Sequence, residues 1–291
     1  MDDTHTISAG GITATIKADG AELCSLQAAD GLELLWQAGP AWPRHAPWLF
    51  PIVGRLANDE LRHGGKSYHL TQHGFARDLR FRWLQRTGQS CTLRLTDSAA
   101  TRPRYPFGFD LDISYAITEA CLDMRVDLAN TGEETLPASF GAHPAFNWPL
   151  LPGLSKESYS LIFGEPEPAA IRRLSGGLIR TEPEPSPVQG TVLPLNEGLF
   201  AADAVILDAP ASRSVRYAGP SGPSLELAWS GFHELGIWSK PAAPFLCIEP
   251  WRGFASPAGF DGEFSDKPGL MLIAPGATER LSLSIKVDAA L

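Results

Sequence analysis

The chain has 291 residues, of which 44% are hydrophobic and 20% are charged, a composition typical of a folded globular protein. Its net charge is −9, from 24 basic and 33 acidic residues, so it lacks the extended basic surface that binds nucleic acid or an anionic membrane. We therefore expect neither as a partner, and a chain of this size can bury a large core without disulfides or a structural metal.

The N-terminal stretch MDDTHTISAGG has no basic region and no apolar run of signal-peptide length, and no window approaches ~20 uninterrupted apolar residues. The four cysteines contain no C-x-x-C pair, which excludes zinc-ribbon and thioredoxin-like motifs. Cys24, Cys91 and Cys247 lie in apolar or alternating runs, where we expect buried free thiols. These features predict a cytoplasmic protein.

Alternation of apolar and polar residues dominates the chain. It is present in residues 91–96 (CTLRLT), 109–117 (FDLDISYAI), 122–130 (LDMRVDLAN) and 281–287 (LSLSIKV). Such alternation is typical of antiparallel strands with one buried and one solvated face. With 28 glycines and 25 prolines, turns come too often for long helices, and no amphipathic helix of 12 or more residues is evident. The sequence predicts an all-β fold, a sandwich or a barrel of antiparallel strands.

Residues 164–190 differ in composition from the rest of the chain. They contain the tetrapeptide EPEP twice, and their prolines remove donors that a strand ladder would need. Alternation resumes on both sides without a change in composition. We therefore expect one domain over residues 1–291, with an exposed Pro/Gly-rich excursion at about 164–190.

Four stretches interrupt the alternation and combine aromatic residues and proline with titratable or cationic groups. This composition suits a small-molecule cleft. A sugar fits it for a specific reason: the C–H face of a pyranose lies on an aromatic ring while its hydroxyls reach charged side chains. The stretches are residues 43–59 (PRHAPWLFPIVGRLAND), 73–78 (HGFARD), 140–150 (FGAHPAFNWPL) and 245–257 (FLCIEPWRGFASP).

The titratable groups of these stretches allow three kinds of chemistry to be compared. Neither His73 nor His143 has a His or Cys two to five residues further on, and Glu249 is distant from both, so no metal site is predicted. A G-x-S-x-G elbow and Gly-rich phosphate loops are also absent. Proton transfer between His and Glu remains. Each histidine alone is as readily a surface or core residue, whereas Glu249, at the end of an apolar run, is better explained by function.

At the same stretches the sequence resembles the aldose 1-epimerase (galactose mutarotase-like) superfamily, in particular its shorter bacterial branch. The resemblance rests on APWLFPIVGRL, HGFARD, the His-Pro step of FGAHPAFNWPL, LFAADAVIL and FLCIEPWRG, which occur in the family's order and span most of the chain. It implies a large antiparallel β-sandwich, the supersandwich, that acts on a sugar without metal or organic cofactor. The expected assembly is a monomer or a homodimer.

The resemblance also implies roles for individual residues. His143 corresponds to the general acid that protonates the ring oxygen, and Glu249 to the general base at the C1 hydroxyl. His73 corresponds to a substrate-binding histidine, and Asp203 to a carboxylate that holds sugar hydroxyls. Two aromatic residues of the motifs, Trp251 and Phe75, are further candidates for contact with the sugar, although core packing explains them most simply.

One position departs from the family pattern. Galactose mutarotases end a G-R-x-A-N-R stretch with a binding arginine, whereas GRLAND has Asp59 at that place. Arg55 and Arg77 are the candidates to replace it. HGFAR also occurs in the hexose-6-phosphate 1-epimerase branch, but the Arg-Gly-Gly-Ile-Pro stretch of that branch is absent, which favours a sugar without phosphate. A phosphosugar epimerase and a non-catalytic carbohydrate-binding module remain as alternatives.

Overall fold

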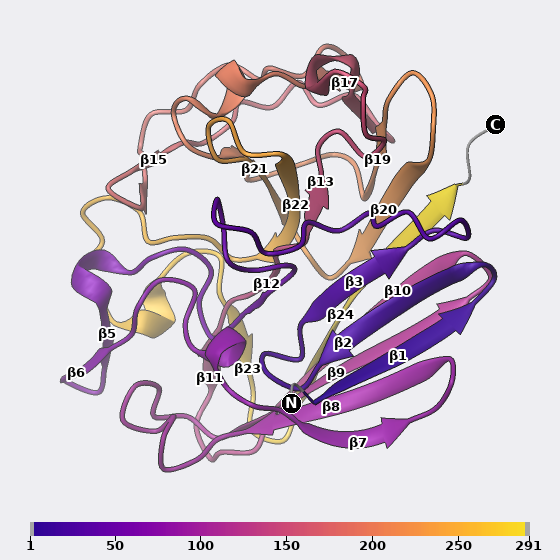
Figure 1. The fold of residues 1–291 in the computed structure, drawn as a ribbon. Coiled ribbons are helices and arrows are strands. Elements are labelled where there is room, and N and C mark those ends of the chain that lie inside the picture. Colours follow the sequence, from indigo (N-terminus) through magenta and orange to yellow (C-terminus); the bar gives the residue numbers. More distant parts are fainter. Residues whose placement is uncertain (1–2, 289–291) are drawn as a thin grey trace.

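The structure is a computed structural model that describes residues 3–288 (Figure 1). Antiparallel strands dominate it, and the helices within this range are single 3₁₀ turns. The predicted all-β fold is confirmed. The helical turns are η1 (Ala57–Asp59), η2 (Ala76–Asp78), η3 (Lys156–Ser158), η4 (Glu197–Phe200) and η5 (Phe264–Asp266).

The alternating segments form one large antiparallel sheet of nine strands. Their registers place apolar residues opposite one another, as where Val126 faces Ile113 and Leu281. One face of the sheet is therefore a continuous apolar surface. In spatial order the strands are β17 (Val192–Pro194), β14 (Ser160–Phe163), β19 (Ser214–Ala218), β20 (Ser224–Ser230), β24 (Thr278–Asp288), β10 (Cys121–Asn130), β9 (Phe109–Thr118), β8 (Ser90–Thr96) and β7 (Arg82–Arg86).

A second sheet contains the aromatic motifs, and smaller sheets flank the two. The second sheet is β18 (Val205–Leu207), β21 (Glu234–Trp238), β22 (Phe245–Arg252), β12 (Phe140–Ala142) and β4 (Trp48–Leu49), with β13 (Ala145–Asn147) also paired to β22. The smaller sheets are β1 (Thr4–Ala9), β2 (Ile12–Lys17) and β3 (Leu23–Gln27); β5 (Glu60–His63) and β6 (Lys66–His69); β11 (Leu136–Ala138) and β23 (Met271–Ile273); and β15 (Leu174–Ser175) and β16 (Leu178–Ile179).

The main core lies between the two large sheets. Phe50 packs edge-on against Phe109 with ring centroids 4.9 Å apart, and the Trp48 indole N–H donates to the Tyr115 hydroxyl at 2.6 Å. The β22 strand directs Leu246 and Ile248 into this core. Because side chains alternate along a strand, its residues 245, 247, 249 and 251 point to the opposite face of the sheet.

The excursion joins β14 to β17, and it is not simply exposed. Ile171 and Arg173 are buried, and the β15–β16 hairpin contributes Leu174 to the wall of the cleft described below. The expectation of an exposed segment is wrong for these residues, because the hairpin folds back over the second sheet.

Two further expectations can be compared with the structure. All four cysteines are free thiols; Cys91 and Cys247 are buried, whereas Cys24 is only half-buried. Within residues 3–288, no helix has the length and apolar character needed to cross a membrane.

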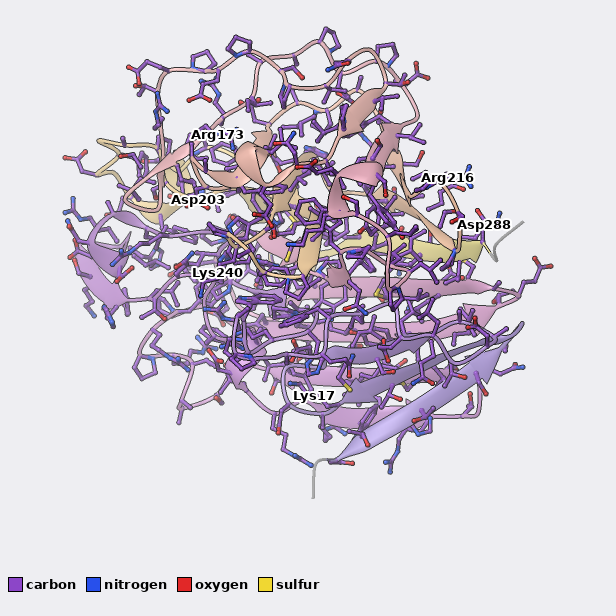
Figure 2. The ribbon with its side chains drawn as sticks, turned by 45° about the horizontal axis from the view of Figure 1, so that its top comes forward. Lys17, Arg173, Asp203, Arg216, Lys240 and Asp288 are labelled. Carbon is purple, nitrogen blue, oxygen red and sulfur yellow. The ribbon has the colours of Figure 1, made fainter. Side chains whose placement is uncertain are left out.

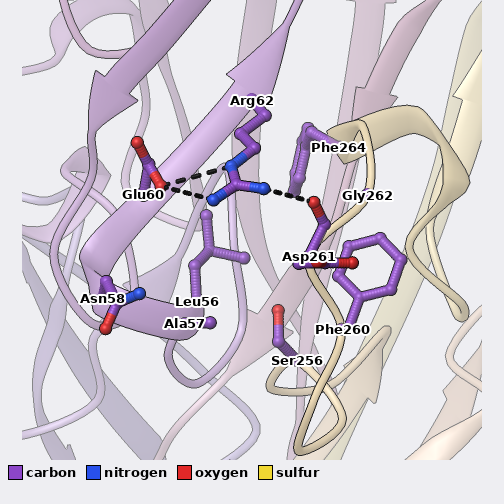
Figure 3. Close-up of a pocket in the computed structure, with 10 residues that line it drawn as sticks. All are labelled: Leu56, Ala57, Asn58, Glu60, Arg62, Ser256, Phe260, Asp261, Gly262 and Phe264. Atoms are coloured by element: carbon purple, nitrogen blue, oxygen red, sulfur yellow. Dashed lines mark hydrogen bonds and ion pairs between the residues drawn. The ribbon is translucent and has the colours of Figure 1, made fainter.

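The segment after β22 is fastened to β5. The Arg62 guanidinium donates to the Glu60 carboxylate and to the Asp261 carbonyl across a small cavity (Figure 3). That cavity has a volume of 50 Å³, and since one water occupies about 30 Å³ of the liquid, it is too small for a sugar.

Candidate active site

A cleft of 440 Å³ opens on the face of the second sheet that is turned away from the core. Volumes of this size are typical of small-molecule sites. The cleft brings together seven of the eight residues singled out from the sequence: Arg55, His73, Arg77, His143, Asp203, Glu249 and Trp251.

Phe75 is the exception, and its assignment as a substrate contact is wrong. It is 1% exposed and packs against Phe50 and Tyr105 in the core. His73 and Gly74 both adopt left-handed backbone angles, with φ of 66° and 68°. This turn sends His73 toward the cleft and Phe75 into the core.

The position of Glu249 depends on Trp251, two residues further along β22. The Trp251 indole N–H donates to Glu249 Oε2 at 3.2 Å. The indole ring lies across the neighbouring strands, where a Cβ atom at Gly236 or Gly141 would overlap it. These two glycines leave the space that allows Trp251 to hold Glu249.

His143 is held in the short connection between β12 and β13. Its backbone N–H donates to the Pro47 carbonyl at 3.1 Å. Its ring stacks on Trp42, with centroids 4.9 Å apart and 24° between the planes, and meets the edge of Trp238 at 5.9 Å. Neither of these tryptophans was identified from the sequence.

Phe146 and Trp148, which follow His143 closely in the sequence, do not lie beside it in the cleft. Both are 0% exposed and belong to the main core. The alternation of β13 turns them away from the cleft.

His143 and Glu249 are in direct contact, with 3.2 Å between Nε2 and Oε2. Burial, with the nearby positive charges of Arg77 and Arg44, lowers the pKa of His143. Burial also raises the pKa of Glu249, an effect that the Trp251 hydrogen bond only partly offsets. Both shifts favour the neutral forms. Burial thus biases both groups toward the uncharged form, an imidazole beside a carboxylic acid.

His73 is fixed by reciprocal hydrogen bonds with Gly54. The His73 backbone N–H donates to the Gly54 carbonyl at 2.8 Å, and the Gly54 N–H donates to His73 Nδ1 at 3.1 Å. Burial and the neighbouring His143 and Arg77 lower the pKa of His73, so its ring is neutral. Because Nδ1 accepts, Nε2 carries the proton, and it lies 3.2 Å from the side-chain amide of Gln72.

Asp203 lies in a turn that is held by a buried arginine. Its φ is 69°, a left-handed conformation. The Arg173 guanidinium donates from Nη1 to the carbonyls of Leu199 (3.0 Å) and Asp203 (2.9 Å); Figure 2 shows the two labelled residues close together. Arg173 is 7% exposed. Sequence reasoning missed it, since an arginine in a Pro/Gly-rich segment gives no sign of burial.

The two arginines proposed to replace the family's binding arginine differ in their surroundings. Arg55 forms two hydrogen bonds with the carboxylate of Asp59, at 2.7 and 2.8 Å. Arg77 donates to the Gln72 carbonyl at 2.8 Å. Its buried Nε has no hydrogen-bond partner among residues 3–288 and lies 3.8 Å from Asp78 Oδ2. Arg55 is thus bound by the residue that stands in place of the family's arginine.

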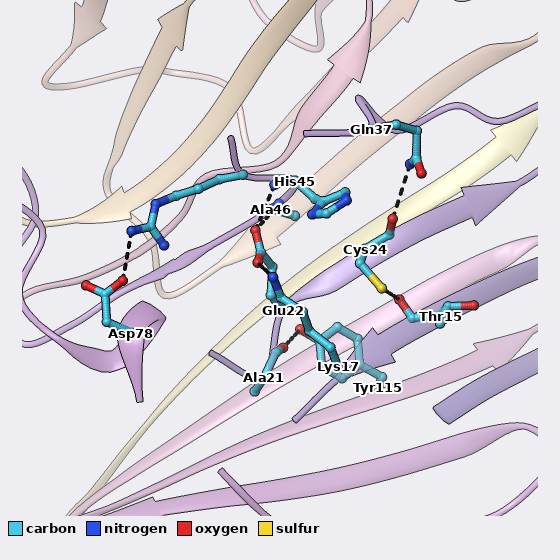
Figure 4. Close-up of polar contacts among 11 residues, drawn as sticks. Thr15, Lys17, Ala21, Glu22, Cys24, Gln37, His45, Ala46, Asp78 and Tyr115 are labelled. Atoms are coloured by element: carbon cyan, nitrogen blue, oxygen red, sulfur yellow. Dashed lines mark hydrogen bonds and ion pairs between the residues drawn. The ribbon is translucent and has the colours of Figure 1, made fainter. Parts of the chain in front are cut away.

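The loop that carries Trp42 is anchored by Glu22. Both the His45 and the Ala46 backbone N–H groups donate to Glu22 Oε1, at 2.8 and 2.9 Å, and Lys17 pairs with Oε2 (Figure 4). Glu22 is 2% exposed. This buried carboxylate holds the chain just before β4, so that Trp42 reaches His143.

A cysteine also lies close to the two catalytic candidates, His143 and Glu249. The sequence spacing did not predict this proximity. Cys247 precedes Glu249 by two residues on the same face of β22. Its sulfur, one nitrogen of His143 and one oxygen of Glu249 all lie within 4.8 Å of one another. Nitrogen, oxygen and sulfur donors thus lie close together, the first two on the wall of the cleft and the buried sulfur beside them.

The sandwich and its His–Glu cleft define a member of the aldose 1-epimerase family, to which the chain belongs: the sequence profile of that family matches residues 3–254. Among its relatives is the LacX protein of Lactococcus lactis subsp. lactis, 33% identical over 288 residues, which are 95% of this chain and 96% of the relative.

Solved structures agree with this assignment. A galactose mutarotase related enzyme from Lactobacillus acidophilus is 33% identical, with a TM-score of 0.93 over 99% of this chain and 98% of that one. A galactose mutarotase-like protein from Lactobacillus casei ATCC 334 is 32% identical, with a TM-score of 0.91 over 98% and 100% of the two chains. The predicted galactose mutarotase-like fold is confirmed.

Proposed function

We propose that the protein is an aldose 1-epimerase that interconverts the α and β anomers of a free hexose. The observation that carries the proposal is the 3.2 Å contact between His143 Nε2 and Glu249 Oε2 on the floor of the cleft. The anomeric hydroxyl oxygen and the ring oxygen of a pyranose are bonded to the same carbon, so two adjacent proton-transfer groups can serve both.

The reaction needs one base and one acid. The Glu249 carboxylate takes the proton of the C1 hydroxyl while the His143 imidazolium gives a proton to the ring oxygen, and the bond between C1 and that oxygen breaks. Rotation about C1–C2 presents the other face of the aldehyde. Glu249 then returns its proton to the carbonyl oxygen, His143 takes the proton of the C5 hydroxyl, and the ring closes.

The proton count of the free site fits this cycle. Ring opening starts from imidazolium and carboxylate and ends with neutral imidazole and carboxylic acid, so the pair holds one proton throughout. The pKa directions of His143 and Glu249 favour the neutral state, which is the state that accompanies the open-chain sugar. Transfer across the 3.2 Å contact regenerates the reactive ion pair.

The remaining cleft residues suit a neutral sugar. His73 Nε2 can donate to a hydroxyl, and Asp203 can accept from hydroxyls. We assign the missing family arginine to Arg77, because Arg55 is engaged by Asp59. Trp42 and Trp238 offer ring surfaces beside His143 for the C–H face of the sugar.

The test is anomer exchange, followed by polarimetry or NMR, across a panel of free aldoses and glucose 6-phosphate. We expect exchange of a free hexose to fall by about 10² to 10⁴ in His143→Asn and in Glu249→Gln. Glu234→Gln is the matched control, since Glu234 is also buried and lies on the neighbouring strand β21, but does not line the cleft.

Three results would contradict the proposal. Near-wild-type exchange in both variants would remove the acid/base assignment. Sugar binding by calorimetry without exchange above the uncatalysed rate would identify a carbohydrate-binding module instead. Exchange of glucose 6-phosphate alone would identify a phosphosugar epimerase.

A further inference from the structure

Cys247 lies beside the proton-transfer pair, and the proposed reaction does not use it. It is 0% exposed and packs beside Ala145 and Phe245. The same strand directs Cys247 and Glu249 to one face, while the β12–β13 connection brings His143 to them. A thiol that served packing alone would not need to lie within 4.8 Å of both proton-transfer groups.

The three donors match the chemistry of a particular class of ion. Imidazole nitrogen, thiolate sulfur and carboxylate oxygen are the ligands of Zn²⁺, and sites with three protein ligands leave a fourth position open. Calcium and magnesium prefer oxygen ligands alone. All three donor residues are buried, with exposures of 7% for His143, 0% for Cys247 and 1% for Glu249.

We infer that His143, Cys247 and Glu249 form a binding site for Zn²⁺ or another thiophilic divalent cation, and that the bound ion inhibits the enzyme. The binding half of this inference rests on the three donors alone. The inhibitory half rests on the proposed function, because the ion occupies both proton-transfer groups.

Charge balance favours the exchange of protons for a metal ion at this place. Binding replaces the thiol proton and the single proton of the His143–Glu249 pair with one divalent cation, and two protons leave. The ligands then carry two negative charges against two positive ones, so the buried site stays neutral. His143 and Glu249 line the cleft, so the ion enters from there and competes with the sugar.

The first measurement is optical and does not depend on activity. Metal-free protein, kept reduced with a reductant that has no thiol, is titrated with Co²⁺, and we expect a 1:1 complex with a thiolate-to-cobalt charge-transfer band. Zn²⁺ should displace the cobalt. In Cys247→Ser the band should vanish and Zn²⁺ affinity measured by calorimetry should fall about tenfold or more. Cys121→Ser, which removes a half-buried thiol on β10, is the matched control and should keep both.

The second measurement is kinetic. We expect Zn²⁺ to inhibit anomer exchange in competition with the sugar, and Cys247→Ser to keep the uninhibited rate while losing the inhibition. If the Cys247 variant does not fold, His143→Asn removes another ligand and must also lose Zn²⁺ affinity. Unchanged Zn²⁺ affinity in a folded variant, or no 1:1 complex with wild-type protein at millimolar metal, would overturn the site.

The two proposals fail separately. A protein without epimerase activity on any sugar could still give the cobalt band and its loss in Cys247→Ser. Conversely, an active enzyme indifferent to Zn²⁺ would leave the acid/base assignment untouched and remove the metal site.

Discussion

Glu22 and Glu249 are both almost fully buried, at 2% and 1% exposure, but their surroundings differ. Glu22 accepts two backbone N–H groups and pairs with Lys17. Glu249 accepts one indole N–H and faces the imidazole of His143. Glu22 is held by three donors and fastens a loop, whereas Glu249 accepts from one donor and faces a second proton-transfer group.

The comparison shows what distinguishes a structural from a reactive buried acid. Several donors hold a structural carboxylate in place, because moving it would leave those donors unpaired. One donor and a proton-exchanging neighbour leave the group able to gain and lose a proton. The Glu22 loop supports the Glu249 site, since it brings Trp42 against His143.

The stability of two glutamine variants tests this difference most directly. We expect Glu22→Gln to lower the free energy of unfolding by about 2–3 kcal/mol, because Lys17 loses its partner and the amide offers a donor where an acceptor is needed. Glu249→Gln should leave it unchanged or raise it at pH 7, because a carboxyl whose pKa is raised by folding costs stability above its unfolded value of 4.5.

Urea unfolding at pH 7 measures both values. Glu60→Gln is the control for a lost surface charge: Glu60 pairs with Arg62 at 3.2 Å on the surface, and its loss should cost about 0–1 kcal/mol. Equal destabilisation by Glu22→Gln and Glu249→Gln would show that the two carboxylates play the same structural role.

Arg173→Lys extends the comparison to a binding residue held by a buried cation. One ammonium cannot keep both carbonyl contacts and the 3.4 Å contact of Nε with Glu184, so the Asp203 turn should loosen. We expect KM for the sugar to rise about tenfold with little change in kcat, because the proposed role of Asp203 is to hold hydroxyls in ground and transition states alike.

Arg172→Lys is the matched control for this change. The Arg172 side chain donates to the Asp208 carboxylate and to the Thr181 carbonyl, and it does not contact the Asp203 turn. Steady-state polarimetry measures KM and kcat separately. A fall in kcat at constant KM would place Arg173 in support of the acid/base pair instead.

The sequence indicated the strands and the catalytic candidates because both leave local signals. Alternation identified β9, β10 and β24, and the motifs identified His143, Glu249, His73 and Asp203. The sequence did not indicate Trp42, Trp238 or Arg173, since these reach the cleft from separate loops and strands through tertiary contacts. It also misplaced Phe75, because a left-handed backbone at His73 and Gly74 reverses the direction of the chain there.

The contact of Cys247 with His143 and Glu249 could not be predicted for a related reason. A zinc motif is recognisable when its ligands are close in sequence, whereas here the histidine comes from β12–β13 and the other two donors from β22. Only the pairing of those strands, as where Ala145 lies opposite Cys247, brings the donors together.

The pH dependence of kcat/KM is the smallest expected effect and tests the proton shared by His143 and Glu249. With ordinary pKa values of 6.5 and 4.5, activity would be greatest between them and would fall as the pH rises through 6.5. Folding instead lowers the pKa of His143 and raises that of Glu249. A second proton binds to the His143–Glu249 pair only at a pH well below 6.5. The last proton leaves the pair only at a pH well above 4.5. The state with one proton should therefore persist between these two pH values.

We therefore expect kcat/KM to stay constant as the pH rises through 6.5, with its acid limb below that value. Arg77→Gln should move the acid limb upward, because the positive charge of Arg77 contributes to the lowered pKa of His143. The profile is measured by polarimetry after correction for uncatalysed exchange in each buffer. A decline through pH 6.5 would mean that His143 titrates independently, and the contrast between a satisfied Glu22 and a proton-sharing Glu249 would then lose its functional meaning.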